Sequence, residues 1–196
     1  MLFLLRRCSA GLLQLEKYAL IFLAASVTGL ILVNVTTRSL SMAIYWIDEL
    51  AIYAMIWMVM IGASVTIRQR KGIAVTLAEA FVGDRINSLF RVLVDLLILL
   101  FAATLLVLCW LWYDPLAFAA AGFDAEAFSA DSFNFIYQEP TNTIGVPKYL
   151  VWLVMPLTAT SMLLHALANL FERAGGFSHP YREPNHPGPV DKQGQG

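Results

Sequence analysis

The sequence has 196 residues, of which 59% are hydrophobic and only 14% charged, and its net charge is −1. A soluble domain carries about 25% charged residues, so this chain lacks nearly half of the charge that a water-facing surface needs. The composition therefore argues against a soluble globular domain, a disordered chain or, without a basic stripe, a nucleic-acid-binding protein.

Four apolar stretches are long enough, or nearly so, to cross a bilayer. A hydrocarbon core roughly 30 Å thick needs about 20 helical residues, and only a helix satisfies its own backbone in lipid. The sequence predicts an all-α membrane domain over residues 1–174, followed by a flexible cytoplasmic tail at 175–196. The four transmembrane helices are expected at about 18–37, 46–67, 89–113 and 149–171.

The distribution of cations predicts the orientation of these spans. Eleven of the 13 Lys and Arg residues fall on one side, in the N-terminal segment, the middle loop and the tail, whereas only Arg38 and Lys148 fall on the other. Loops rich in Lys and Arg stay in the cytoplasm, so we expect both termini there. In the middle loop, Ile73, Leu77 and Phe81 recur at helical spacing and predict a short amphipathic interfacial helix.

Loop 114–148, on the outer side of the membrane, is expected to be ordered. It contains five acidic residues and one lysine, and phenylalanines recur every five residues, at 118, 123, 128 and 133. Side chains five residues apart point in different directions around an α-helix, so the rings cannot line one face of a regular helix. Because aromatic residues oppose disorder, we expect the loop to pack on the membrane or on a partner.

The sequence contains no catalytic or metal-binding pattern. Cys8 and Cys109 lack ligand spacing, and His165 stands alone in the fourth span, where packing is the better interpretation. Membrane enzymes and pumps place ionisable groups near the bilayer centre, and the expected spans contain almost none. We therefore expect no catalytic residue, no cofactor and no bound metal.

Polar and small residues gather instead at two places in the second span. Trp46, Asp48 and Glu49 open it, which suits either an interfacial belt with acids at a helix N-terminus or a patch docked on a partner subunit. Gly62 and Ala63 let another helix approach closely, whether that helix belongs to this chain or to a partner.

The order of these features resembles a known family. It runs through Glu16, Arg38, Trp46-x-Asp48-Glu49, Gly62-Ala63, Arg68 and Ile73-x-Val75. Together they resemble the small membrane subunit (DctQ type) of tripartite ATP-independent periplasmic (TRAP) transporters. The chain departs from the family where Gly72 and Thr76 replace a frequent His and Asp, and in the length of loop 114–148.

The resemblance implies a non-catalytic scaffold in the bacterial inner membrane, within a sodium-driven secondary transporter that imports an organic acid. Its implied partners are a large multi-span subunit (DctM type), a periplasmic binding protein (DctP type) and membrane lipid. The alternatives are a small four-helix membrane enzyme or redox protein, and a self-assembling channel. The residues expected to contact the large subunit are Arg38, Trp46, Asp48, Glu49, Gly62, Ala63 and Arg68, and those expected to receive the binding protein are Asp124, Glu126 and Asp131.

Overall fold

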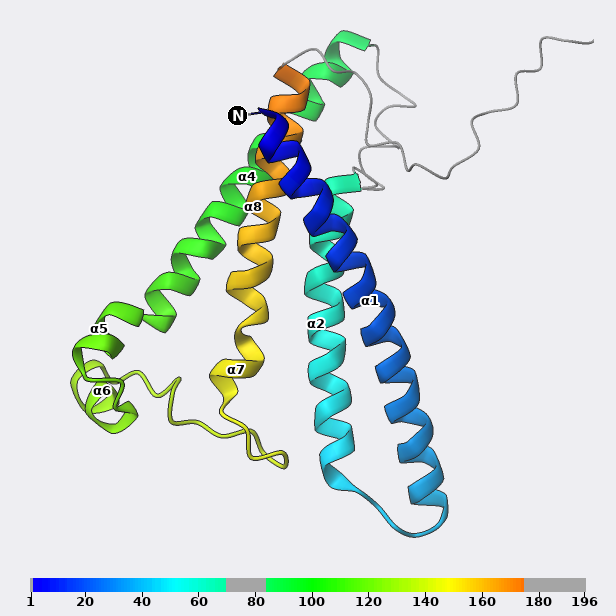
Figure 1. Ribbon diagram of the computed structural model, residues 1–196, viewed down its shortest axis with the longest axis vertical. Coiled ribbons are helices and arrows are strands. Elements are labelled where there is room, and N and C mark those ends of the chain that lie inside the picture. The colour runs from blue at the N-terminus through cyan, green and yellow to red at the C-terminus, as the bar shows by residue number, and fades with distance from the viewer. Residues whose placement is uncertain (1, 70–83, 175–196) are drawn as a thin grey trace, which may run out of the picture.

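The computed structural model describes residues 2–69 and 84–174 (Figure 1). Within these two ranges the chain is helical and contains no β-strand. The helices are α1 (Leu2–Ser39), α2 (Tyr45–Gln69), α4 (Asp84–Tyr113), α5 (Pro115–Ala120), α6 (Ala125–Ser132), α7 (Lys148–Trp152) and α8 (Val154–Ala174). The amphipathic helix expected around Ile73 and the tail 175–196 lie outside the described residues.

The four transmembrane helices predicted from the sequence are confirmed. In the described part of the chain, four segments are long and apolar enough to cross a membrane: Phe3–Ser39, Tyr45–Gln69, Val92–Ala120 and Lys148–Glu172. The main difference is in α1, whose 38 residues extend far before the expected span. At a rise of about 1.5 Å per residue, α1 is roughly 57 Å long and exceeds the hydrocarbon core. Glu16 therefore lies inside a helix rather than before one.

Helix α8 lies at the centre of the bundle. It packs against α1, α2 and α4, while α1 and α2 form an antiparallel hairpin. Ser, Thr, Asn and Ala contribute many of its buried side chains, and such small residues let neighbouring helices approach closely in a membrane. Helix α8 thus joins the α1–α2 hairpin to α4.

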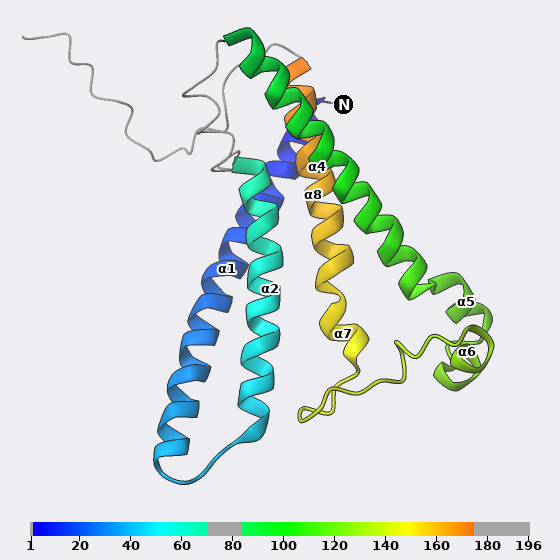
Figure 2. The ribbon, with the colours of Figure 1, turned by 180° about the vertical axis from the view of Figure 1, so that it is seen from behind.

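The bundle is splayed. The N-terminus, the start of α4 and the end of α8 lie together at one end, whereas α4 diverges from α8 toward the other end, as both views show (Figures 1 and 2). Helices α5 and α6 continue from the far end of α4, and the segment after α6 returns to α7.

The fourth span is broken between α7 and α8. Pro156, the third residue of α8, has no N–H to donate to the carbonyl of Trp152, one turn earlier, and its ring crowds that carbonyl. The Trp57 indole N–H of α2 donates to the neighbouring carbonyl of Val151 at 2.8 Å. A side chain from another helix therefore satisfies backbone near the break, as the bilayer requires.

Candidate functional site

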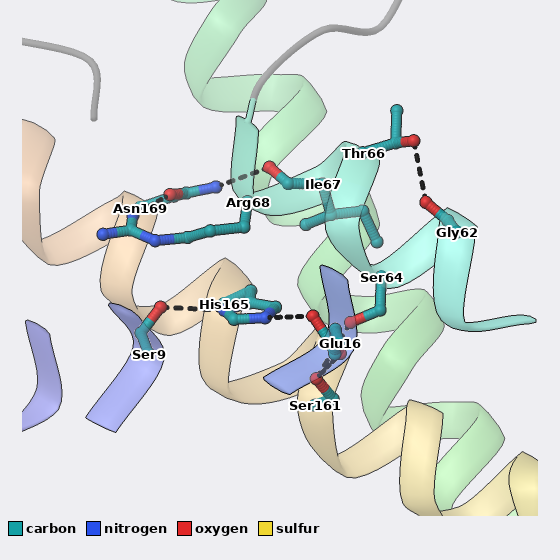
Figure 3. Close-up of polar contacts among 10 residues, drawn as sticks. All are labelled: Ser9, Glu16, Gly62, Ser64, Thr66, Ile67, Arg68, Ser161, His165 and Asn169. Atoms are coloured by element: carbon teal, nitrogen blue, oxygen red, sulfur yellow. Dashed lines mark hydrogen bonds and ion pairs between the residues drawn. The ribbon is translucent and has the colours of Figure 1, made fainter. Parts of the chain in front are cut away.

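A buried polar cluster lies where α1, α2 and α8 meet (Figure 3). All of its side chains are buried, and each of its members on α1 or α2 hydrogen-bonds to α8. We call this cluster the polar core. Its members are Ser9 and Glu16 of α1, Ser64 and Arg68 of α2, and Ser161, His165, Asn169 and Glu172 of α8.

One half of the polar core centres on Glu16. His165 Nε2 lies 3.1 Å from one carboxylate oxygen of Glu16, and the Ser161 hydroxyl donates to the other. Ser64 donates to Ser161 at 2.9 Å, and Ser9 Oγ lies 2.8 Å from His165 Nδ1. These contacts are all satisfied when the Nε2–H of His165 donates to the Glu16 carboxylate.

The other half centres on Arg68. Its guanidinium donates to both carboxylate oxygens of Glu172, at 2.9 and 3.1 Å, and to the Asn169 side-chain oxygen at 2.6 Å. Asn169 in turn donates to the carbonyl of Ile67 at 2.9 Å, and Arg6 lies 3.2 Å from Glu172. This two-pronged geometry suits arginine and makes the strongest kind of protein ion pair.

The polar core corrects the expectation that the helices bury almost no ionisable group. Glu16, Arg68 and Glu172 are only 7%, 4% and 6% exposed. Each stands within two residues of a predicted span end, and packing of three helices removes them from water. His165 was correctly interpreted as a packing residue, although it also links α1 to α8 through both ring nitrogens.

A signal for the polar core was present in the sequence. Ser9 and Glu16 are seven residues apart, and Ser64 and Arg68 are four apart. Residues at these spacings share one face of a helix, and the spacing continues along the fourth span. The matching polar face of α8 consists of Ser161, His165, Asn169 and Glu172.

The polar core is built to hold helices together. Most of its donors and acceptors pair with one another inside the chain, although the buried Nε of Arg68 has no hydrogen-bond partner. The described residues contain no group of three or more His, Cys, Asp or Glu that could hold a metal ion. Apart from their contact with each other, Glu16 and His165 are engaged by serine hydroxyls.

The acids that open α2 contact this chain. Asp48 forms an ion pair with Arg38 at 2.6 Å and accepts from Asn34, which closes the α1–α2 hairpin. Glu49 accepts from the backbone N–H groups of residues 142–144, at 2.6 to 3.1 Å, and from the Tyr53 hydroxyl at 2.8 Å. Glu49 therefore tethers loop 114–148 to α2.

Loop 114–148 is ordered, as expected. The Asp114 and Asp124 side chains cap α5 and α6, and the phenylalanines divide between the two helices and the turns after them. Phe118 stacks on Tyr137 with ring centroids 3.8 Å apart, and Phe128 packs edge-on against both. The loop therefore has a small aromatic core of its own.

Tyr137 joins this aromatic core to the end of α4. Its hydroxyl donates to the carbonyl of Tyr113 at 2.6 Å, and the Asn134 amide donates to the carbonyl of Trp112 at 2.7 Å. These carbonyls have no partner within α4 itself, since they belong to its last turn. Burial, helped by the nearby Asp114 carboxylate and Tyr149, raises the pKa of the Tyr137 phenol.

The remaining candidate contact residues differ in accessibility. Trp46 and Ala63 are exposed, whereas the position of a side chain at Gly62 faces Leu20 of α1, 4.0 Å away. Arg68 lies in the polar core. The three acids expected to receive a binding protein, Asp124, Glu126 and Asp131, are all exposed on α6 or beside it.

Comparison with known proteins identifies the family. A family model described as "Tripartite ATP-independent periplasmic transporters, DctQ component" matches residues 27–176. The chain belongs to this family. No curated protein and no solved structure matches it. A DctQ component is an inner-membrane subunit of a transporter, so the family and the location inferred from the order of motifs are confirmed.

The family match covers most of the described bundle. It includes α2, α4 and α8 entirely and the second part of α1, so Ser9 and Glu16 precede it while the rest of the polar core lies inside it. It also includes the whole of loop 114–148. This DctQ component thus has four helices that could cross a membrane, and its polar core binds three of them together.

Proposed function

We propose that this DctQ component is a non-catalytic scaffold subunit of a sodium-driven transporter that imports an organic acid. In this proposal a periplasmic protein of the DctP type delivers the acid, and a large subunit of the DctM type carries it across. The use of a sodium gradient and the organic-acid substrate are both inferred from membership of the family. Both termini are proposed to lie in the cytoplasm, because the cations gather on that side.

The observation that supports a scaffold is the closed polar core. A substrate or ion pathway needs polar groups that are free to bind what passes, and these usually line a cavity near the bilayer centre. Here Glu16, Arg68 and His165 are engaged by side chains of the same chain. Their arrangement rigidifies three helices, which suits a subunit that braces a moving neighbour.

Outward-facing apolar surface supports a docking role for the helices. Helices α1 and α4 carry many of the chain's exposed large hydrophobic side chains, which face lipid or a larger subunit. On α2, the exposed Ala63 leaves room for a helix of the large subunit to approach. We propose Trp46 and Ala63 as the accessible part of that contact, with Arg38 and Asp48 at its outer end. Glu49, Gly62 and Arg68 would act indirectly, by shaping α2.

Transport by reconstituted components tests the scaffold. The chain, its large subunit and the binding protein are placed in proteoliposomes, and uptake of a labelled four-carbon dicarboxylate and a labelled sugar acid is followed. We expect uptake of one of them only with all three proteins and an inward sodium gradient. Uptake by this chain alone would support a channel, and equal uptake without it would exclude a scaffold role.

A substitution pair tests the docking surface. Ala63→Leu fills the space on the exposed face of α2, so we expect less co-purification with the large subunit while the chain keeps its thermal stability. Ala25→Leu, at an exposed position on α1, is the matched control and should leave the complex intact. A complex that survives Ala63→Leu unchanged would remove this face of α2 from the contact.

A further inference from the structure

A groove lies at the end of the bundle that carries loop 114–148. Its volume is about 340 Å³, and it opens between the end of α4, the start of α7 and segment 133–139. Trp112 and Trp152 line it with ring centroids 6.3 Å apart, and Glu139 and Lys148 stand at its polar part. None of these four residues belongs to the polar core.

The groove lies where a membrane protein meets phospholipid headgroups. Trp112 is in the last turn of α4, Lys148 begins the candidate span Lys148–Glu172, and Trp152 lies one turn into that span. Tryptophan is enriched at this depth because its ring is apolar and its N–H is polar. Phe133 and Phe135 also line the groove and are 83% and 50% exposed, which provides an apolar border.

The charges of the groove form a fixed pair of opposite sign. Lys148 Nζ lies 3.1 Å from Glu139 Oε2, and the Lys148 backbone N–H donates to the Glu139 carbonyl at 2.8 Å. The side chains are 33% and 56% exposed, so each keeps surface for a further contact. A headgroup with one phosphate and one ammonium, lying antiparallel to this pair, would complement both charges.

We propose that this groove binds the headgroup of a zwitterionic phospholipid. The phosphate contacts Lys148, the ammonium contacts Glu139 and the faces of Trp112 and Trp152, and the acyl chains leave along Phe133. Tryptophan faces attract cations, which adds to the attraction of the carboxylate. The other acids of loop 114–148 repel anionic lipids, so the surrounding charge also favours a neutral headgroup. The proposal is independent of the scaffold function.

Retention of defined lipids by the purified full-length chain tests this proposal. The chain is exchanged in detergent into phosphatidylethanolamine, phosphatidylcholine or phosphatidylglycerol, and bound lipid is counted by native mass spectrometry. We expect one zwitterionic lipid per chain. Glu139→Gln and Lys148→Met should each lower retention about tenfold, because each removes one charge-assisted contact.

The second outer ion pair provides the control. Arg38→Met and Asp48→Asn each disrupt another pair of opposite charges, 2.6 Å apart and outside the groove, and they should leave lipid retention by the purified chain unchanged. Circular dichroism and thermal midpoints of the variants confirm that they are folded. Equal retention by groove variants and wild type, or stronger retention of phosphatidylglycerol, would overturn the proposal. So would loss of the lipid on assembly with the large subunit, since the groove would then be a subunit interface.

Discussion

Arg68→Met tests whether the polar core stabilises the bundle. Arg68 is 4% exposed and makes three hydrogen bonds to Asn169 and Glu172. Removing one partner of a buried ion pair costs about 3–5 kcal/mol, because the other charge is left without compensation. Arg6 still lies 3.2 Å from Glu172 but is half-exposed, so part of that charge stays neutralised. We therefore expect a loss of about 3 kcal/mol in the free energy of unfolding.

Unfolding in mixed micelles, followed by circular dichroism while the denaturing detergent fraction increases, measures this loss. Arg68→Lys keeps the positive charge but not the planar guanidinium, so it should lower the free energy of unfolding less than Arg68→Met does. Arg68→Met combined with Glu172→Gln removes both charges, and we expect a coupling energy of at least about 1.5 kcal/mol relative to additive single effects. A change below about 0.5 kcal/mol for Arg68→Met, or strictly additive variants, would refute a stabilising role for this pair. A stable Arg68→Met chain that no longer binds the large subunit would make Arg68 a partner contact instead.

Three further predictions concern loop 114–148. The folded loop raises the pKa of Tyr137 above its ordinary value of 10.0. The neutral phenol therefore stabilises the folded loop fully below pH 10, and this stabilisation is lost as the pH rises through the pKa of the folded state. Proteolysis of the loop should therefore accelerate above pH 10 in wild type and stay flat in Tyr137→Phe; parallel curves would contradict this. Phe133 has φ 54° and an exposed ring, so Phe133→Gly should raise the free energy of unfolding by about 1 kcal/mol. A lower free energy of unfolding would show that the ring makes a stabilising contact. A reporter fused at residue 130 should be active only on the periplasmic side, and cytoplasmic activity would reverse the proposed topology.

The sequence predicted the parts of the fold that depend on local composition. The lengths of the apolar stretches located all four spans, because a bilayer requires a minimum helix length and backbone groups that are hydrogen-bonded within the helix. The order in loop 114–148 was also predictable, since its phenylalanines and tyrosines provide more apolar surface than a solvated chain can leave exposed. These inferences needed no knowledge of which helices meet.

The polar core was not predicted, because burial at a span end is a property of packing. Hydropathy treats Glu16 and Arg68 as flanking residues in water, whereas the extension of α1 and its crossing with α8 enclose them. The contact between Glu49 and residues 142–144 joins segments more than 90 residues apart, and no local pattern indicates such a pairing. Both features depend on the arrangement of helices rather than on their existence.

The position of α8 after α1 and α2 in the chain has a consequence for synthesis and insertion. The hydrogen bonds and ion pairs that bring the α1 and α2 members into the polar core are made with α8, which leaves the ribosome after both of these helices. Until it inserts, Glu16 and Arg68 are two ionisable groups in an unfinished hairpin, exposed to the machinery that retains or degrades incomplete membrane proteins. A chain truncated before Val154 should then be recognised as incomplete, whereas a chain that contains α8 conceals the same groups. The cluster can therefore act as a marker that α8 has been inserted, as well as a structural joint.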